Sequence, residues 1–207
     1  MKHKQAKIIS LPLLFVLSLS MLSCNNEGIP NYNLHTELQI KYLEGEYNLI
    51  SLYAKGTEEL SKPEGVLLEW NDFSSSEYEV KISKNENMEE IVTTYVTSDN
   101  FITAFNFEIN ETYYWCASNN DGKTKVQSFT TNCYAPRSLN IEGLTNARDL
   151  GGYSIGEGKY TKQGVIYRTS RLNENETTDL LISESGINEM VNRLKIKSEL
   201  DIRRVDK

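Results

Sequence analysis

The sequence is short of basic residues. Lys and Arg number 22 against 29 Asp and Glu, which gives a formal net charge of -7. Nucleic-acid binding needs a basic face for the phosphates, so this balance argues against a nucleic-acid partner. Histidine occurs only twice and cysteine three times. No His, Cys, Asp or Glu cluster in the middle of the chain has the spacing of metal ligands, and we expect neither a metal nor a cofactor.

Long apolar runs are also missing. The longest covers residues 8–22 and follows three lysines in a start without acidic residues. It is shorter than the ~20 residues that cross a bilayer as a helix. A basic start, a short apolar core and small residues at its end predict an export signal. The alternative is an N-terminal core helix, which the pattern favours less.

The end of that run, Met-Leu-Ser-Cys at residues 21–24, resembles the lipobox of bacterial lipoproteins. Ser23 and Cys24 fit it, and Met21 stands where Leu is commoner. The resemblance implies that residues 1–23 are a signal peptide and that Cys24 is lipidated. The protein would then be anchored in the cell envelope, at the outer membrane or on the periplasmic face, and its membrane partner would be reached through the lipid. Residues 24–44 would be a solvated tether.

Residues 45–131 read as all-β. Six short segments alternate or are rich in β-branched and aromatic residues, and polar turns separate them: 66–70, 78–82, 91–96, 101–107, 112–117 and 125–131. This spacing predicts a β-sandwich. The segments 68–70, 78–83, 112–115 and 128–131 resemble those of fibronectin type III modules, whereas residues 33–60 fit that pattern poorly.

The aromatic residues and the cysteines of this region need separate interpretation. Trp70 and Trp115 could form a platform for a sugar, but the alternation favours core positions. The Asn-Asn-Asp-Gly turn at 119–122 puts Cys116 opposite about residue 125, which leaves it roughly 26 Å from Cys133 at the rise of a strand. A disulfide needs Cα atoms within about 7 Å, so we expect two free thiols.

After a linker at 132–139, residues 140–207 change to a mixed α/β texture. Residues 146–153 (Asn-Ala-Arg-Asp-Leu-Gly-Gly-Tyr) predict a tight turn or a close backbone approach at the two glycines. Residues 165–167 predict a short strand and residues 198–203 a second one, with Asp201 and Arg203 on one face. A helix between them would be capped by Ser183 or Ser185 and would present the apolar stripe Ile187, Met190, Val191 and Leu194.

These ordered motifs, over about residues 140–204, resemble the opening of the bacterial tyrosine/serine protein phosphatase family. The resemblance implies the truncated start of an α/β cysteine-phosphatase domain. Together with the preceding all-β, fibronectin III-like sandwich, it predicts a multidomain chain. It implies a phosphoprotein or another phosphoester as the substrate of a complete member. The candidates for the phosphate site, or for orienting it, are Arg148, Asp149, Arg168, Asp201 and Arg203. The alternative for both aspartates is that they only fix backbone turns and neighbouring Arg side chains.

The sequence departs from the family at the reacting group. The family's nucleophile is a thiolate in a His-Cys-x₅-Arg loop that cradles the phosphate. Six positions after the three cysteines stand Pro30, Gly122 and Leu139, and no His precedes a Cys. We therefore expect no catalytic residue in this sequence, which stops ahead of the loop. We also expect its α/β part to be loosely folded or completed by another chain, because it buries little apolar surface.

Three hypotheses for the function follow. The first is a phosphatase-family lipoprotein that is inactive alone. The second is a cell-surface lipoprotein that binds a protein or a glycan through its β-sandwich. The third is a pseudophosphatase that binds phosphate through Arg148 or Arg168 without turnover.

Overall fold

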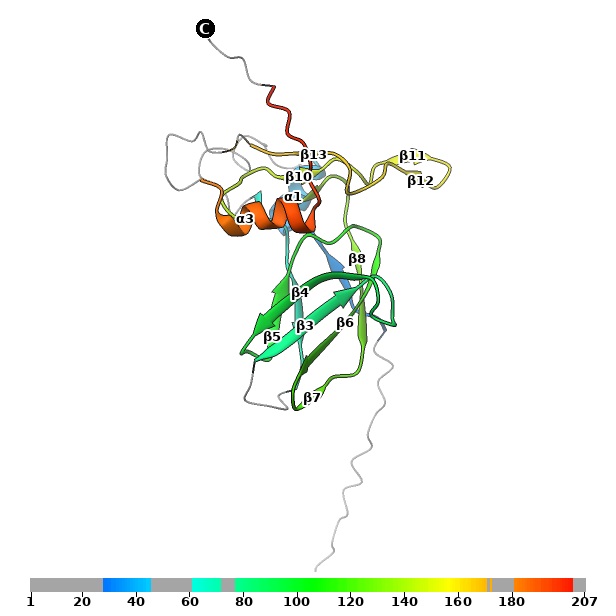
Figure 1. Cartoon of the computed structure of the whole chain (residues 1–207). Coiled ribbons are helices and arrows are strands. Elements are labelled where there is room, and N and C mark those ends of the chain that lie inside the picture. Colours follow the sequence, from blue (N-terminus) through cyan, green and yellow to red (C-terminus); the bar gives the residue numbers. More distant parts are fainter. Residues whose placement is uncertain (1–27, 46–60, 72–76, 171, 173–180, 203–207) are drawn as a thin grey trace, which may run out of the picture.

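The structure is a computed structural model that describes residues 28–45, 61–71, 77–170, 172 and 181–202. The predicted signal peptide, the predicted lipidation site Cys24 and Arg203 lie outside the described residues. Two groups of elements share the chain (Figure 1). We call strands β1–β8 with helix α1 the β-module, and strands β9–β13 with helices α3 and η3 the C-terminal unit.

The β-module consists of two sheets. The larger has the order β1-β8-β6-β3-β4, with β7 paired to β6, and the smaller joins β2 and β5. The strands are β1 (Asn31–Asn33), β2 (Val66–Glu69), β3 (Tyr78–Ser83), β4 (Ile91–Thr97), β5 (Phe101–Ala104), β6 (Thr112–Asn119), β7 (Gly122–Lys123) and β8 (Gln127–Asn132). All pairs are antiparallel except β1 with β8. All six predicted strands are therefore present.

The two sheets bury one common core. Inward residues alternate with outward ones along β2 and β5, as the sequence pattern predicts. Both sheets contribute to the cluster, with Val66, Leu68, Trp70, Tyr78, Val80, Ile82, Ile102, Ala104, Tyr113, Trp115, Ala117 and Phe129. Trp70 is 6% and Trp115 4% exposed, which confirms their interpretation as core residues. The likeness to fibronectin type III modules stays a prediction.

The register of the β6–β7 hairpin bears on the predicted absence of a disulfide between Cys116 and Cys133. Ser118 pairs with Lys123 across the turn, and Trp115 pairs with Gln127 further along. Both Cys116 and Cys133 are free, as predicted.

Residues 31–43, expected as part of a solvated tether, are instead packed on the β-module. Strand β1 extends the large sheet along β8, and Leu34 enters the core at 4% exposure. Helix α1 (Glu37–Leu43) follows, and a capping box between Thr36 and Gln39 closes its first turn. The sequence does contain this Thr-x-x-Gln pattern, and it explains why a helix begins here.

The C-terminal unit has a small sheet in the order β13-β10-β9 and a separate hairpin of β11 and β12. Its elements are β9 (Arg137–Ser138), β10 (Arg148–Asp149), β11 (Ser154–Gly156), β12 (Lys159–Tyr160), β13 (Tyr167–Arg168), α3 (Glu184–Asn188) and the π-helical turn η3 (Glu189–Arg193). Leu139, Ile141, Leu144, Ala147 and Leu194 form its core.

The observed elements differ from the predicted ones in three places. The expected linker contains β9, which pairs with β10, so its second half belongs to the C-terminal unit. The strand expected over 165–167 is displaced to Tyr167–Arg168. Residues 198–202 form no strand, although they alternate as one. Leu200 and Ile202 are 84% and 86% exposed, because no neighbouring strand among the described residues pairs with them.

The predicted helix is confirmed, with Ser183 as its cap. Its apolar stripe is divided. Leu194 is buried and Met190 packs on the core, whereas Ile187 and Val191 are about half exposed. The stripe is thus only partly covered. Within the described part of the chain, no helix combines the length and the apolar character that a membrane span requires.

Candidate functional site

The predicted site residues Arg148, Asp149 and Arg168 come together on the small sheet. Arg148 of β10 lies opposite Arg168 of β13, and the next residue, Asp149, lies opposite Tyr167. Successive side chains of a strand point to opposite faces. Arg148 and Arg168 therefore belong to one face, and Asp149 belongs to the other.

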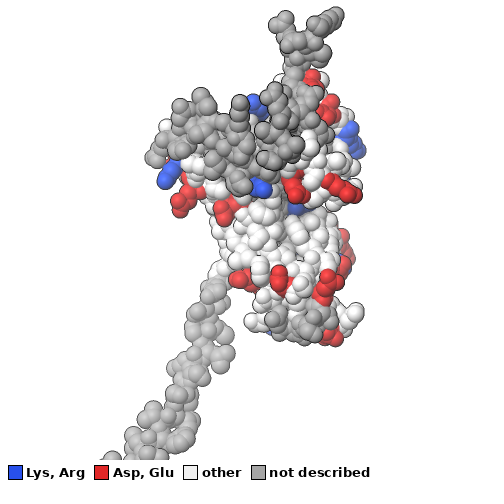
Figure 2. All heavy atoms as spheres, turned by 90° about the vertical axis from the view of Figure 1, so that its left-hand side faces the viewer, with Lys and Arg blue, Asp and Glu red and all other residues white. Residues whose placement is uncertain are grey.

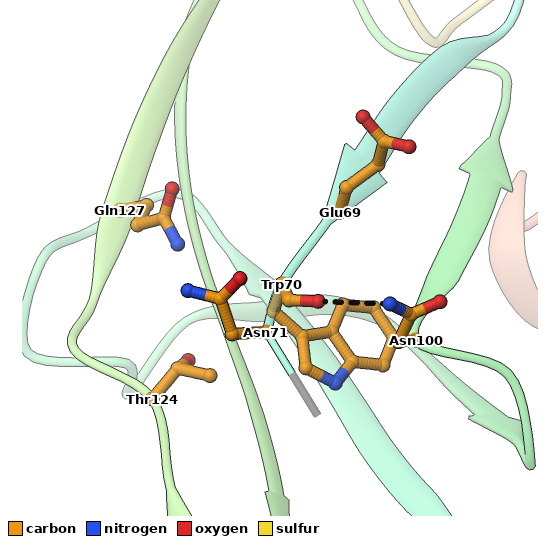
Figure 3. A pocket seen from close by; sticks show the side chains of 6 residues that line it. All are labelled: Glu69, Trp70, Asn71, Asn100, Thr124 and Gln127. Carbon is orange, nitrogen blue, oxygen red and sulfur yellow. Dashed lines mark hydrogen bonds between the residues drawn. The ribbon is translucent and has the colours of Figure 1, made fainter. Parts of the chain in front are cut away.

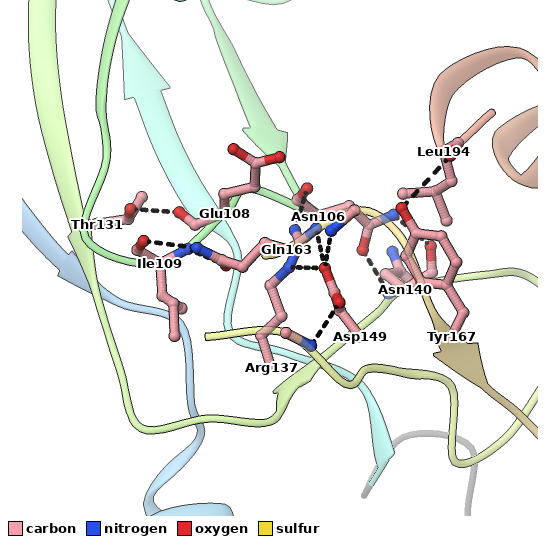
Figure 4. A network of polar contacts seen from close by, with 12 residues as sticks. Asn106, Glu108, Ile109, Thr131, Arg137, Asn140, Asp149, Gln163, Tyr167 and Leu194 are labelled. Atoms are coloured by element: carbon pink, nitrogen blue, oxygen red, sulfur yellow. Dashed lines mark hydrogen bonds and ion pairs between the residues drawn. The ribbon is translucent and has the colours of Figure 1, made fainter. Parts of the chain in front are cut away.

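Asp149 is wholly buried and its carboxylate is fully engaged (Figure 4). Oδ2 accepts hydrogen bonds from Arg137 Nη2 at 2.9 Å, from Arg137 Nε at 3.1 Å and from the Gly164 amide at 2.7 Å. Oδ1 accepts one from the Gly151 amide at 2.8 Å. A carboxylate bound in this way fixes two turns and one guanidinium, which is the alternative interpretation given above for Asp149.

The two glycines after β10 are required by a close backbone contact at Gly151 and by the backbone conformation at Gly152. A Cβ on Gly151 would lie 2.4 Å from both the Lys162 carbonyl oxygen and the Gln163 Cα. Gly152 has a φ of +87°, in the left-handed region that glycine adopts at little cost. The predicted close approach at these residues is confirmed, and it brings the 150–152 and 161–164 segments together.

The other face carries two cations side by side. Arg148 is half-buried and Arg168 is exposed, and their backbones are directly paired. Like charges opposite each other on neighbouring strands repel. Figure 2 shows acidic side chains on both the upper and the lower part of the molecule, with the basic ones mainly on the upper part.

A groove of about 810 Å³ runs beside β13. Residues 164–170, including Arg168, line one wall, and residues 194–202, including Lys195, Lys197 and Asp201, line the other. The Tyr167 hydroxyl donates a hydrogen bond to the Leu194 carbonyl at 3.4 Å and connects the walls. Asp201 is exposed and lines the same groove as Arg168. Arg203 lies outside the described residues.

The sequence did not reveal three polar residues that organise this region. Arg137 was assigned to the linker, yet it makes the ion pair with Asp149. Asn106 and Gln163 connect the β-module to the C-terminal unit (Figure 4). No local spacing signals these contacts, because their partners are between 12 and 54 residues away along the chain.

Neither cysteine of the described region is suited to nucleophilic attack. Cys116 is 2% exposed, in the core sheet. Burial raises the pKa of Cys133 from 9.0 to about 12, against the opposing charge of Arg137. A thiol with that pKa is protonated at neutral pH and is not a nucleophile. The described residues also contain no group of three His, Cys, Asp or Glu side chains that could hold a metal ion.

A second hollow, of about 490 Å³, opens on the β-module (Figure 3). It is lined by Glu69, Trp70, Asn71, Asn100, Thr124 and Gln127. Asn100 Nδ2 donates to the Trp70 carbonyl at 3.3 Å. The buried Trp70 Nε1 has no hydrogen-bond partner. This hollow shares none of its lining with the groove beside β13.

Comparison with known proteins gives one result that bears on this site. No curated protein and no solved structure matches the chain. The model of the tyrosine phosphatase family matches residues 139–206. That range contains β10, β13, α3 and η3, together with both arginines of the paired strands and the groove beside them. The match supports a phosphatase-family assignment for this third of the chain.

Proposed function

We propose that residues 139–206 bind a phosphoester anion at Arg148 and Arg168, as a tyrosine-phosphatase-family segment, and that a chain of this sequence does not hydrolyse it. The observation that carries the proposal is the pairing of two arginines on adjacent strands inside the range that the family model matches. Guanidinium groups suit phosphate oxygens because their N–H donors form two parallel bonds.

The groove beside this pair suggests what else the ligand contains. Val165 and Ile166 line the groove and are 58% and 60% exposed. Apolar contacts of this kind suit the ring of a phosphotyrosine, while Arg168 meets the phosphate. We therefore favour a phosphotyrosine peptide over a compact phosphoester.

The proposed lack of turnover rests on the thiols. The family's reaction needs a thiolate and an Arg six positions beyond it, and no Cys-x₅-Arg occurs in this sequence. The remaining groups can bind and orient an anion. They cannot form the covalent intermediate that splits the reaction into two steps.

Calorimetric titration of the purified chain with a phosphotyrosine peptide tests the binding, and phosphate release from the same peptide tests the turnover. We expect saturable binding that weakens about tenfold in Arg168→Gln, the loss of one charge-assisted contact. The matched control Lys123→Gln removes one exposed charge on the β-module and should bind like the wild type. Equal affinity in Arg168→Gln, or release of phosphate at a catalytic rate, would refute the proposal.

The resemblance of residues 21–24 to a lipobox supports a further proposal, that the protein is lipidated on Cys24 and held in the cell envelope. Mass spectrometry of the protein purified from bacterial membranes should find an acylated Cys24 at the N-terminus. Cys24→Ser should leave the protein unacylated and release it from the membrane fraction. An intact Met1 in the membrane-bound protein would contradict the proposal.

A second candidate function is glycan binding by the β-module, favoured by the polar hollow of Figure 3. Asn71, Asn100 and Gln127 supply amide donors and acceptors there. A glycan array probed with the whole chain should show a signal that Gln127→Ala removes and Lys123→Ala leaves unchanged. The absence of any signal would dismiss this candidate without affecting the first.

A further inference from the structure

The β5–β6 connection, residues 105–111, meets the C-terminal unit through an amide side chain that pairs with backbone. Asn106 Nδ2 donates to the Asn140 carbonyl at 2.9 Å, and Asn106 Oδ1 accepts from the Asn140 amide at 2.6 Å. Asn106 Nδ2 also contacts the Glu189 carboxylate at the start of η3. One side chain of the β-module thus satisfies both backbone groups of a residue in the opposite unit.

The reverse arrangement stands on the other side of the junction. Gln163 Oε1 accepts from the Ile109 amide at 2.8 Å, and Gln163 Nε2 donates to the Ile109 carbonyl at 3.1 Å. Here an amide of the C-terminal unit satisfies the backbone of the β-module (Figure 4). The two pairings are reciprocal, and each would leave partly buried donors and acceptors without partners if the units separated.

The buried ion pair depends on the same connection. Arg137 uses Nε and Nη2 for Asp149, and it donates Nη1 to the Asn106 carbonyl at 2.7 Å. The guanidinium is therefore divided between the two units. Asp149 in turn accepts hydrogen bonds from the amides of Gly151 and Gly164. Gly151 follows β10 and Gly164 precedes β13, the two strands that carry the paired arginines.

Apolar and aromatic contacts close the junction. The Arg193 guanidinium lies 5.5 Å from the centroid of the Phe107 ring and contacts the Phe105 carbonyl. Ile109 approaches Gly152 so closely that a Cβ there would lie 2.6 Å from Ile109 Cδ1. Phe107 and Ile109 also belong to the core of the β-module, at 1% and 3% exposure. The junction is thus continuous with that core.

We infer that the 105–111 connection of the β-module is the docking surface on which the C-terminal unit folds, so that the conformation of the Gly151 and Gly164 turns is set by the β-module. Among the described residues, the core of the C-terminal unit contains five buried side chains, too few to order it without this surface. The two units unfold as one. The inference does not depend on anion binding, so it stands or falls separately from the proposed function.

Hydrogen exchange on the full chain tests the inference. Asn106 has a φ of +65°, so Asn106→Gly removes the side chain while keeping a backbone that tolerates this conformation. Exchange at the Gly151 and Gly164 amides should accelerate at least about tenfold, because the hydrogen bonds between the Asn106 side chain and the Asn140 backbone are lost. Asn192→Ala, an exposed asparagine on η3, is the matched control and should leave both amides unchanged.

A second variant keeps the β-module sequence intact. Gln163→Ala removes the reciprocal pairing from the other side and should accelerate exchange at the same two amides. Both tryptophans lie in the β-module, so their fluorescence reports its unfolding alone. In the wild type this signal and the protection of Gly164 should be lost at the same denaturant concentration. Unchanged protection of both glycines in both variants, or separate wild-type transitions, would overturn the inference.

Discussion

The guanidinium of Arg137 donates two hydrogen bonds to a single carboxylate oxygen of Asp149, with Nη2 at 2.9 Å and Nε at 3.1 Å from Oδ2. The side chains are 3% and 0% exposed, so the pair is sealed from water. The ion pair joins β9 to β10, in which Arg137 and Asp149 are directly paired. Asp149 also fixes the turns at Gly151 and Gly164, which it binds through their amides.

Asp149→Ala should therefore destabilise the fold. It leaves a buried guanidinium uncompensated, a loss of about 3–5 kcal/mol. The double variant Arg137→Met with Asp149→Leu removes both charges and should recover part of that loss, because no isolated charge remains. Chemical denaturation, monitored through hydrogen exchange at the Gly164 amide, measures the stability of both variants. A single variant as stable as the wild type would show that the pair contributes nothing.

Gly151→Ala should destabilise the same region by a steric route. The new Cβ would lie 2.4 Å from backbone atoms of Lys162 and Gln163, which cannot rotate away as a side chain could. Overpacking of this kind costs about 1–3 kcal/mol. Gly28→Ala is the control, since no atom of the described residues other than its chain neighbours lies within 4 Å of the added Cβ. Equal thermal midpoints for the two variants would contradict the close approach.

The Cys133 thiol should make the protein lose stability at high pH. Its folded pKa is about 12 against 9.0 for the free group, so the folded state keeps a proton that the unfolded state releases. Stability then falls as pH rises from 9 toward 12. Between pH 8 and about 9, below the ordinary tyrosine pKa of about 10, the thiol should dominate this slope.

Urea denaturation at pH 8, 9 and 10 measures the slope, with Cys133→Ala as the comparison. The variant should be less stable at pH 8 yet lose less between pH 8 and 10. A wild type whose stability is level over that interval would contradict the buried, protonated thiol.

The β-module was largely predictable because its signal is local. Period-two alternation located β2 and β3, β-branched and aromatic content located β4 and β5, and the turn at 119–122 located β6 and β8. The prediction that both cysteines are free is also confirmed. Strand β1 was missed because three residues, of which only Tyr32 is apolar, carry no periodicity. It is recognised by its pairing with β8 and by the ring of Tyr32 against Phe129.

The C-terminal unit was predictable in its motifs and not in its contacts. The tight turn at Gly151 and the cap at Ser183 follow from residue type and spacing. The role of Arg137 does not, because it exists only through the register of β9 with β10. Residues 198–202 carry the alternation of a strand, but alternation describes a side-chain pattern and supplies no partner for the backbone.

Binding of a phosphotyrosine at the paired arginines can be followed residue by residue in an amide chemical-shift titration of the full chain with a phosphotyrosine peptide. The account predicts saturable shifts at Arg148, Arg168 and the groove residues 164–170, lost in the double variant Arg148→Gln with Arg168→Gln and kept in Lys123→Gln. Shifts confined to the β-module, or shifts at residues 164–170 that survive the double variant, would contradict it.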